Sequence, residues 1–266
     1  MKPISLLRFY GDESRSEVVL DAQNNIFISA NTQSNALLPS TLGTYNGAQD
    51  GLVMKINPEC NAVMWSRFIG SPGNDGAFVL DINPQNGSLI VGGATENGGA
   101  GFTGITPSAL SAGNGGIDGF VSILDPNNGA LVKSVIVGTS RTDIIYGLKF
   151  DRKGFPYIMG VSDGLWPLYP TAPTTDIPDP VKRFTYRKDK EGYGQFVAKL
   201  KADLSDFVYS TTFGIEGKFL QPSISPVAFA VDNCENLYIS GWGGNASRSE
   251  EHTSELQSHH DLVCRL

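Results

Sequence analysis

A repeat of four short apolar segments constrains this chain more than any other feature of its sequence. Each unit begins near a glycine, and the four unit starts lie near Gly11, Gly70, Gly138 and Gly214. The last three of these glycines end the similar strings RFIG, VIVG and TTFG. Because self-similarity along a chain is typical of repeat architectures, we expect one structural unit per repeat.

The four segments follow the same order in each unit. The first segment is closed by an aspartate, and the second reads NIFISA, SLIVGG, FPYIMG or NLYISG. All are rich in Val, Ile, Phe and Tyr and are bounded by turn residues, which favours strands over helices. Aspartate side chains hydrogen-bond their own backbone in turns. We therefore interpret the four closing aspartates as structural turn formers, and these are Asp21, Asp81, Asp151 and Asp232.

Four-stranded units in tandem predict an all-β chain with the architecture of a partial β-propeller. One small sheet cannot bury both of its faces, so neighbouring blades must supply the core. The sequence holds three full units, a leading strand at about residues 6–11 and half of a fourth unit. We therefore expect three full blades plus incomplete ones in an open arc, with exposed strand edges and exposed apolar surface between blades.

The segments also resemble a known family. The succession F-x-G, apolar-x-apolar-D, N-x-Y-I-x-G, D-G-F-V-x-K-L and L-V-Y-S is similar to the bacterial seven-bladed β-propeller repeat, and the resemblance covers about Leu6 to Asn245. It looks most like the version in large secreted or surface proteins of Bacteroidetes-type bacteria. The resemblance implies an extracellular or cell-surface location and a non-catalytic scaffold for adhesion, gliding motility or a surface layer. Its partner would be a protein or a glycan at the cell surface.

The repeat stops after NLYISGWGGNAS, and residues 248–266 have no repeat character. Their sequence, RSEEHTSELQSHHDLVCRL, resembles the translation of a common sequencing adapter. We therefore interpret residues 1–247 as an incomplete propeller domain and residues 248–266 as a non-native tail, which must be excluded from fold reasoning. The tail is expected to pack against nothing and to have no regular partner in the last sheet. It contains all three histidines, so residues 1–247 contain none.

Without histidine, residues 1–247 lack the base of Ser-His-Asp and Cys-His sites and the commonest metal ligand. Cys60 and Cys234 lie far apart and form no C-x-x-C pair. We therefore expect no catalytic residue, no cofactor and no metal site.

The net charge of -7 argues against a nucleic-acid partner. No apolar run is long enough for a transmembrane segment, and the start MKPISLLRFYGDE is too short for a signal peptide.

Two other functions stay open. Trp166, Tyr169 and Trp242 fall in or near long loops, where exposed aromatic rings stack on sugars or anchor proteins. They are weak ligand-contact candidates and would suit a carbohydrate-binding propeller. Alternatively, some propellers are lyases or hydrolases, and such an enzyme would use a carboxylate site that the sequence does not identify.

Overall fold

The computed structural model describes residues 16–35, 40–96, 100–102, 104–108, 110, 116–162, 164, 194–213, 224–243 and 263–264. The described residues form strands β1 to β16 and no helix, which confirms the predicted all-β class. The leading strand expected at residues 6–11 lies outside the described residues.

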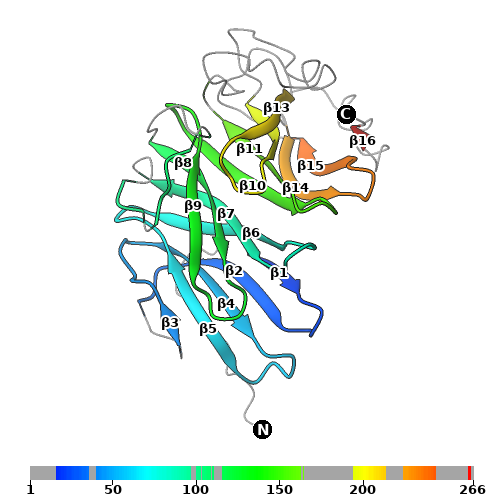
Figure 1. Ribbon diagram of the computed structural model, residues 1–266. Helices are drawn as coiled ribbons and strands as arrows, with labels where there is room; N and C mark the ends of the chain where they lie inside the picture. The colour runs from blue at the N-terminus through cyan, green and yellow to red at the C-terminus, as the bar shows by residue number, and fades with distance from the viewer. Residues whose placement is uncertain are drawn as a thin grey trace.

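The strands form four sheets, here called blades 1 to 4, and the sheets follow one another along the chain (Figure 1). Blade 1 consists of β1 (Glu17–Leu20), β2 (Ile26–Thr32), β4 (Asp50–Ile56) and β5 (Val63–Ile69), with β3 (Thr41–Leu42) added parallel to β5. Blade 2 consists of β6 (Asp75–Ile82), β7 (Leu89–Glu96), β8 (Ile117–Leu124) and β9 (Leu131–Val137). Blade 3 consists of β10 (Asp143–Phe150), β11 (Pro156–Ser162), β12 (Gln195–Leu200) and β13 (Phe207–Phe213). Blade 4 contains β14 (Ile224–Val231), β15 (Leu237–Gly243) and β16 (Val263–Cys264).

Apart from β3, the strands of each complete blade are antiparallel neighbours in chain order, as the four-segment repeat predicts. Successive side chains of a strand point to opposite faces of its sheet. A strand with apolar residues at successive positions therefore makes both faces of its blade apolar. In β4, for example, Val53 faces blade 2, whereas Leu52 and Met54 belong to a separate cluster on the other face of blade 1.

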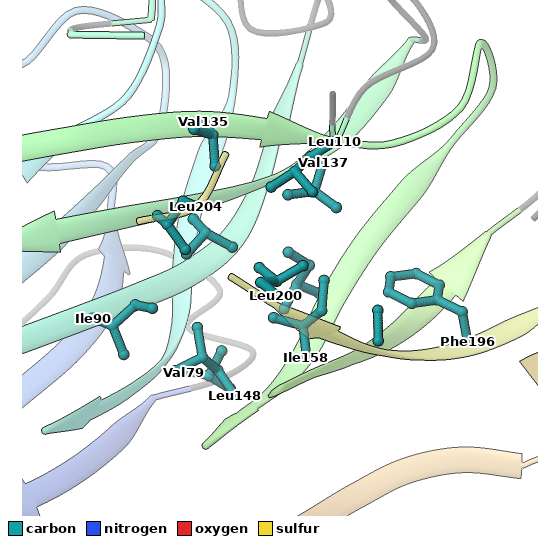
Figure 2. Packing of buried hydrophobic residues seen from close by; sticks show 13 residues of the cluster. Val79, Ile90, Leu110, Val135, Val137, Leu148, Ile158, Phe196, Leu200 and Leu204 are labelled. Atoms are coloured by element: carbon teal, nitrogen blue, oxygen red, sulfur yellow. The ribbon is translucent and has the colours of Figure 1, made fainter. Parts of the chain in front are cut away.

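The core lies between the blades. Figure 2 shows the cluster between blades 2 and 3, in which Val79, Ile90 and Val135 of blade 2 meet Leu148, Ile158 and Phe196 of blade 3. A similar cluster joins blades 1 and 2 around Phe27, Trp65 and Phe120, and a smaller one joins blades 3 and 4 around Tyr157 and Phe229. Burial of these side chains against the next blade is the main favourable contribution to folding.

The two end blades expose side chains whose counterparts are buried inside the array. Val18 of β1 is 54% exposed, whereas Leu148, at the same position in β10, is 1% exposed. At the other end, Tyr238 of β15 is 40% exposed, whereas the matching Tyr157 of β11 is 1% exposed. The arc is therefore open, as predicted, and part of the apolar surface that would lie between blades is exposed, whereas Leu52 and Met54 on the outer face of blade 1 are buried.

The tail differs from its prediction at two residues. Val263 and Cys264 form β16, which pairs antiparallel with Tyr238 and Leu237 of β15. The expectation that the tail has no regular partner in the last sheet is therefore wrong. The physical reason is that β15 ends its sheet and presents unpaired N–H and C=O groups, which pair with any extended segment that reaches them.

Candidate functional site

The first strands of all four blades converge on one side of the arc. β6 packs against β1 and β10, and β10 packs against β14. Where they meet, they surround a hollow of about 150 Å³, and its lining residues are Glu17, Val79, Tyr146, Gly147, Leu148, Lys149, Ala228 and Phe229. Since every blade contributes to this hollow, it is a candidate contact surface of the array.

Bulges in the first strands give this region its aromatic side chains. The pairing of β6 with β7 skips Phe78, and the pairing of β10 with β11 skips Tyr146. A bulged residue leaves the strand register, and its side chain is re-aimed. The two rings come from neighbouring blades and stack with their centroids 6.0 Å apart and their planes 20° apart. The Phe78 ring lies against Gly76, where a Cβ atom would come within 2.3 Å of the ring.

The charges at the hollow are paired with each other. Lys149 Nζ lies 2.8 Å from Glu17 Oε1, and Glu17 Oε2 accepts the N–H of Leu80 at 3.1 Å. Asp81 Oδ1 lies 4.0 Å from the same ammonium group. Burial raises the pKa of Asp81, and the Lys149 charge opposes that rise. The hollow thus combines an ion pair, an aromatic ring and apolar side chains. Such a surface suits a ligand that has both a polar and an apolar part.

None of the residues that the sequence suggested as ligand contacts is among the described residues that line this hollow. Trp166 and Tyr169 lie outside the described residues. Trp242 lies in β15, opposite Ser225 of β14, and its side chain is not described. Phe78 and Tyr146 were not predicted as site residues, although the sequence carries one signal: each lies near the middle of the first segment of its unit, where a bulge breaks the alternation.

Three of the four closing aspartates make the same turn. In each, Oδ1 accepts the backbone N–H groups of the residues two and four positions later, at 2.8–2.9 Å, for Asp21, Asp151 and Asp232. Hydrogen bonds, first that from the Asn236 side chain, lower the pKa of Asp232 to about 2. These carboxylates hold the backbone of a hairpin, which is the role expected of turn formers.

Asp81 departs from the expected turn role. It lies inside β6 opposite Ile90, and its Oδ2 accepts the N–H of Phe150 from blade 3 at 2.7 Å. The turn of this unit comes two residues later, where Asn83 Oδ1 accepts the N–H of Gln85 at 2.8 Å. The string FVLDINPQNG resembles its counterparts up to the aspartate, but the strand pairing continues to Ile82. Asp81 therefore joins two blades rather than closing a strand.

A second polar cluster joins blades 3 and 4. Lys199 Nζ lies 2.8 Å from both Asp151 Oδ2 and Glu235 Oε2, and its ammonium group stands 4.9 Å from the centre of the Tyr157 ring. Lys153 and the Tyr157 hydroxyl also donate to Glu235, at 2.6 and 3.2 Å. Hydrogen bonds from Lys153 and then Lys199 lower the pKa of Glu235 to about 2. This cluster is a structural ion pair that fixes the β14–β15 turn on blade 3.

Other candidate chemistry is limited in the part of the chain that the structure describes. Cys60 and Cys234 are both exposed and carry free thiols. The described residues contain no group of three or more His, Cys, Asp or Glu side chains arranged to hold a metal ion. Among the same residues, no helix has the length and hydrophobicity needed to span a bilayer.

Comparison with known proteins adds one structural similarity. No family model matches the chain, and no curated protein matches it. Among solved structures, the chain is similar to the β-propeller domain of Cps50 (Swd1) from Myceliophteria thermophila, at 11% sequence identity and a TM-score of 0.37. The similarity covers 90% of this chain and 69% of that one. At this level it carries no argument about function, and the assignment as a partial β-propeller rests on the four sheets described above.

Proposed function

We propose that this chain is a non-catalytic interaction module of a secreted or cell-surface bacterial protein, and that it contacts its partner at the hollow where the four first strands converge. The observation that carries the proposal is the composition of that hollow. Its ionisable side chains Glu17 and Lys149 neutralise each other at 2.8 Å, and Tyr146 stacks on Phe78 beside them. Paired charges and rigid aromatic rings suit binding of a partner better than proton transfer.

The location and the family are proposals that rest on the resemblance of the repeat to those of bacterial surface propellers. The partner would be a protein or a glycan of the cell surface. The roles of the recurring polar residues agree with a scaffold, since Asp21, Asp151 and Asp232 support turns, and Glu235 supports a blade contact.

The test is retention of the fluorescently labelled full chain by intact bacterial cells. We expect retention to fall at least about threefold for Tyr146→Ala, because an aromatic contact contributes about 1 kcal/mol. Met64→Ala is the matched control, since Met64 is an exposed apolar residue on β5, far along the sheet from the first strands. Equal retention of the wild-type chain and Tyr146→Ala would rule out the hollow as the contact surface.

Treatment of the cells separates the two kinds of partner and tests the absence of catalysis. Loss of retention after protease treatment would identify a protein, and loss after periodate oxidation would identify a glycan and so favour the carbohydrate-binding alternative.

Release of reducing sugar or unsaturated products from polysaccharides, abolished by a single carboxylate substitution, would show that the chain is an enzyme and would contradict the proposal.

A further inference from the structure

Two junctions between blades bring buried aspartates together. Asp50 begins β4 in blade 1, and Asp75 begins β6 in blade 2. In the next unit, Asp118 lies at the start of β8 and Asp143 begins β10. All four are at most 2% exposed. The members of each pair come from neighbouring blades, so any interaction between them acts directly on the junction.

The glycine that ends each fourth segment lies close to both carboxyl groups. Distances from this glycine therefore limit how far apart the two carboxyl groups can be. A Cβ atom on Gly70 would lie 2.8 Å from Asp50 Oδ1 and 2.8 Å from Asp75 Oδ2. The two oxygens are therefore within twice that distance of each other. The second junction repeats the arrangement, because a Cβ atom on Gly138 would lie 2.5 Å from Asp118 Oδ1 and 3.0 Å from Asp143 Oδ2.

The hydrogen bonds distinguish the two members of a pair. Asp75 Oδ2 accepts the N–H and the hydroxyl of Ser71, at 2.7 and 3.0 Å. Asp143 Oδ2 likewise accepts the N–H and the hydroxyl of Thr139, at 2.6 and 2.8 Å. Donors of this kind stabilise the ionised form of the carboxyl that accepts them.

Asp50 accepts fewer hydrogen bonds than Asp75. Its Oδ2 accepts the N–H of Asn46 at 2.8 Å, and its Oδ1, buried beside Asp75, has no hydrogen-bond partner among the described residues. A buried acceptor without a donor is costly, and two ionised carboxylates at this separation repel each other. A proton on Asp50 Oδ1 removes both costs, because the neutral acid can donate toward Asp75.

The third junction lacks the whole arrangement. In the strand register, Gly194 stands where the other units have Asp50 and Asp118, and Ile224 stands where they have Asp75 and Asp143. The residue after the glycine is Ile215 instead of Ser71 or Thr139. Both acids and the hydroxyl are thus absent together, which indicates that they act as one unit.

From this geometry we propose that the junction between blades 1 and 2 binds one proton between its two aspartates, and that loss of the proton weakens the contact between the blades. At the first junction, Asp50 carries the proton and Asp75 is the ionised acceptor. The junction between blades 1 and 2 is then a pH-sensitive contact.

The surroundings of the first pair favour the protonated form. Among the described residues, the titratable groups that act on it are Tyr45 before β4 and Glu96 at the end of β7. Both are acids, so neither supplies a positive charge. Burial, with a contribution from the charge of Asp75, raises the pKa of Asp50 to about 6, although the Asn46 N–H opposes the rise. Burial also raises the pKa of Asp75.

The sign of the pH dependence follows from the raised pKa. The folded protein holds a proton that the unfolded chain releases near the ordinary aspartate pKa of 3.8. The resulting stabilisation is complete below that value and is lost as the pH rises to about 6. Above that pH the junction contains two charged carboxylates.

The decisive variant is Asp50→Asn, whose amide donates a hydrogen bond toward Asp75 at every pH. At pH 8 we expect its thermal midpoint to exceed that of the wild-type chain by about 3 °C. As the pH is lowered through 6 to 4, this advantage should disappear. Glu59→Gln is the matched control for the lost charge, since Glu59 is exposed. A constant difference between Asp50→Asn and wild type from pH 4 to 8 would overturn the proposal.

A second measurement does not depend on the variant folding. In the full wild-type chain with carboxyl-labelled aspartate, NMR should show at least one aspartate that titrates near pH 6. Titration of every aspartate below about pH 4.5 would contradict a shared proton.

Thermal melts at pH 7 with EDTA and with calcium chloride test whether the two aspartates bind a cation instead of a proton. If calcium raises the midpoint of wild type but not of Asp50→Asn, the pair holds a cation and not a proton.

Discussion

At the scale of single residues, the repeat assigns similar side chains to similar structural roles, and small shifts in register change those roles. Asp21 and Asp151 close their strands and hold a turn, whereas Asp81 lies one residue before the end of β6 and contacts the next blade. The D-G string has two roles as well. Asp50 enters the junction, and Gly51 leaves room for Ala77 of blade 2, which a Cβ atom would approach to 2.9 Å.

The turn assignment in blade 2 is testable by amide hydrogen exchange. Asn83→Ala should speed exchange at Gln85, because its backbone N–H loses the Asn83 acceptor. Asp81→Ala should instead speed exchange at Phe150, whose N–H donates to Asp81. Each loss should cost about 1 kcal/mol of stability. Faster exchange at Gln85 in Asp81→Ala would show that Asp81 forms the turn after all.

Gly70 should tolerate no side chain. In Gly70→Ala the new methyl group would lie 2.8 Å from two carboxylate oxygens, so the blades must separate or the carboxyl groups must move. We expect the free energy of unfolding to fall by about 2 kcal/mol, measured by urea denaturation. Gly116→Ala is the control, because a Cβ atom there has no neighbour within 4 Å. Equal stability of the two variants would contradict the close approach at Gly70.

At the scale of elements, each blade is a local hairpin array, but contacts from the next blade fix its position. The turn between β14 and β15 shows this most clearly, since Glu235 contacts Lys153, Tyr157 and Lys199 of blade 3. The turn between β8 and β9 does the same for blade 1, where Trp65 Nε1 donates to the carbonyl of Pro126 at 3.1 Å.

Glu235→Gln tests the contact between blades 3 and 4. Hydrogen bonds to charged groups contribute about 1.5–3 kcal/mol, and Glu235 is partly exposed, so we expect a loss of about 1.5 kcal/mol at pH 7. The folded pKa of about 2 lies below the ordinary glutamate pKa of 4.5, so this stabilisation is present above pH 4.5. The difference from wild type should therefore shrink as the pH falls from 4.5 toward 2. Denaturant midpoints at several pH values would check this, and a difference that grows in acid would contradict it.

At the scale of the whole molecule, the array is an open arc whose end faces resemble the faces buried inside it. Val18 and Leu20 at one end and Tyr238 at the other are exposed, and the exposed edge of β15 takes up two residues of the tail. An end face of this kind follows from tandem repetition, since every blade is built to be covered on both sides.

Removal of residues 248–266 tests whether the tail belongs to the fold. Of the described tail residues, only Val263 and Cys264 pair with a strand, and they do so at a sheet edge. We expect a chain that ends at Ser247 to keep its far-ultraviolet circular dichroism and to melt within about 2 °C of the full chain. A fall well beyond that margin would show that the tail contributes to the folded domain.

Much of the fold could be predicted from the sequence because its determinants are local. The alternation of Phe27 and Ile28, or of Tyr157 and Ile158, already implies a strand with two apolar faces, and an aspartate followed by Asn25 or Asn236 implies a turn. The register of β6 could not be read in this way, because the bulge at Phe78 and the extension to Ile82 depend on pairing with β7. For the same reason the aromatic pair Phe78 and Tyr146 was not recognised as part of a site.

The sequence by itself determined that this chain consists of four-stranded units in a fixed order, because strand and turn preferences act over a few neighbouring residues. Only the tertiary structure decided which groups from different units meet. The hollow around Tyr146, the contact of Glu235 with Lys199 and the pairing of Asp50 with Asp75 all join residues far apart in the chain. Their energies depend on burial and separation, and these quantities exist only once the blades have packed against each other.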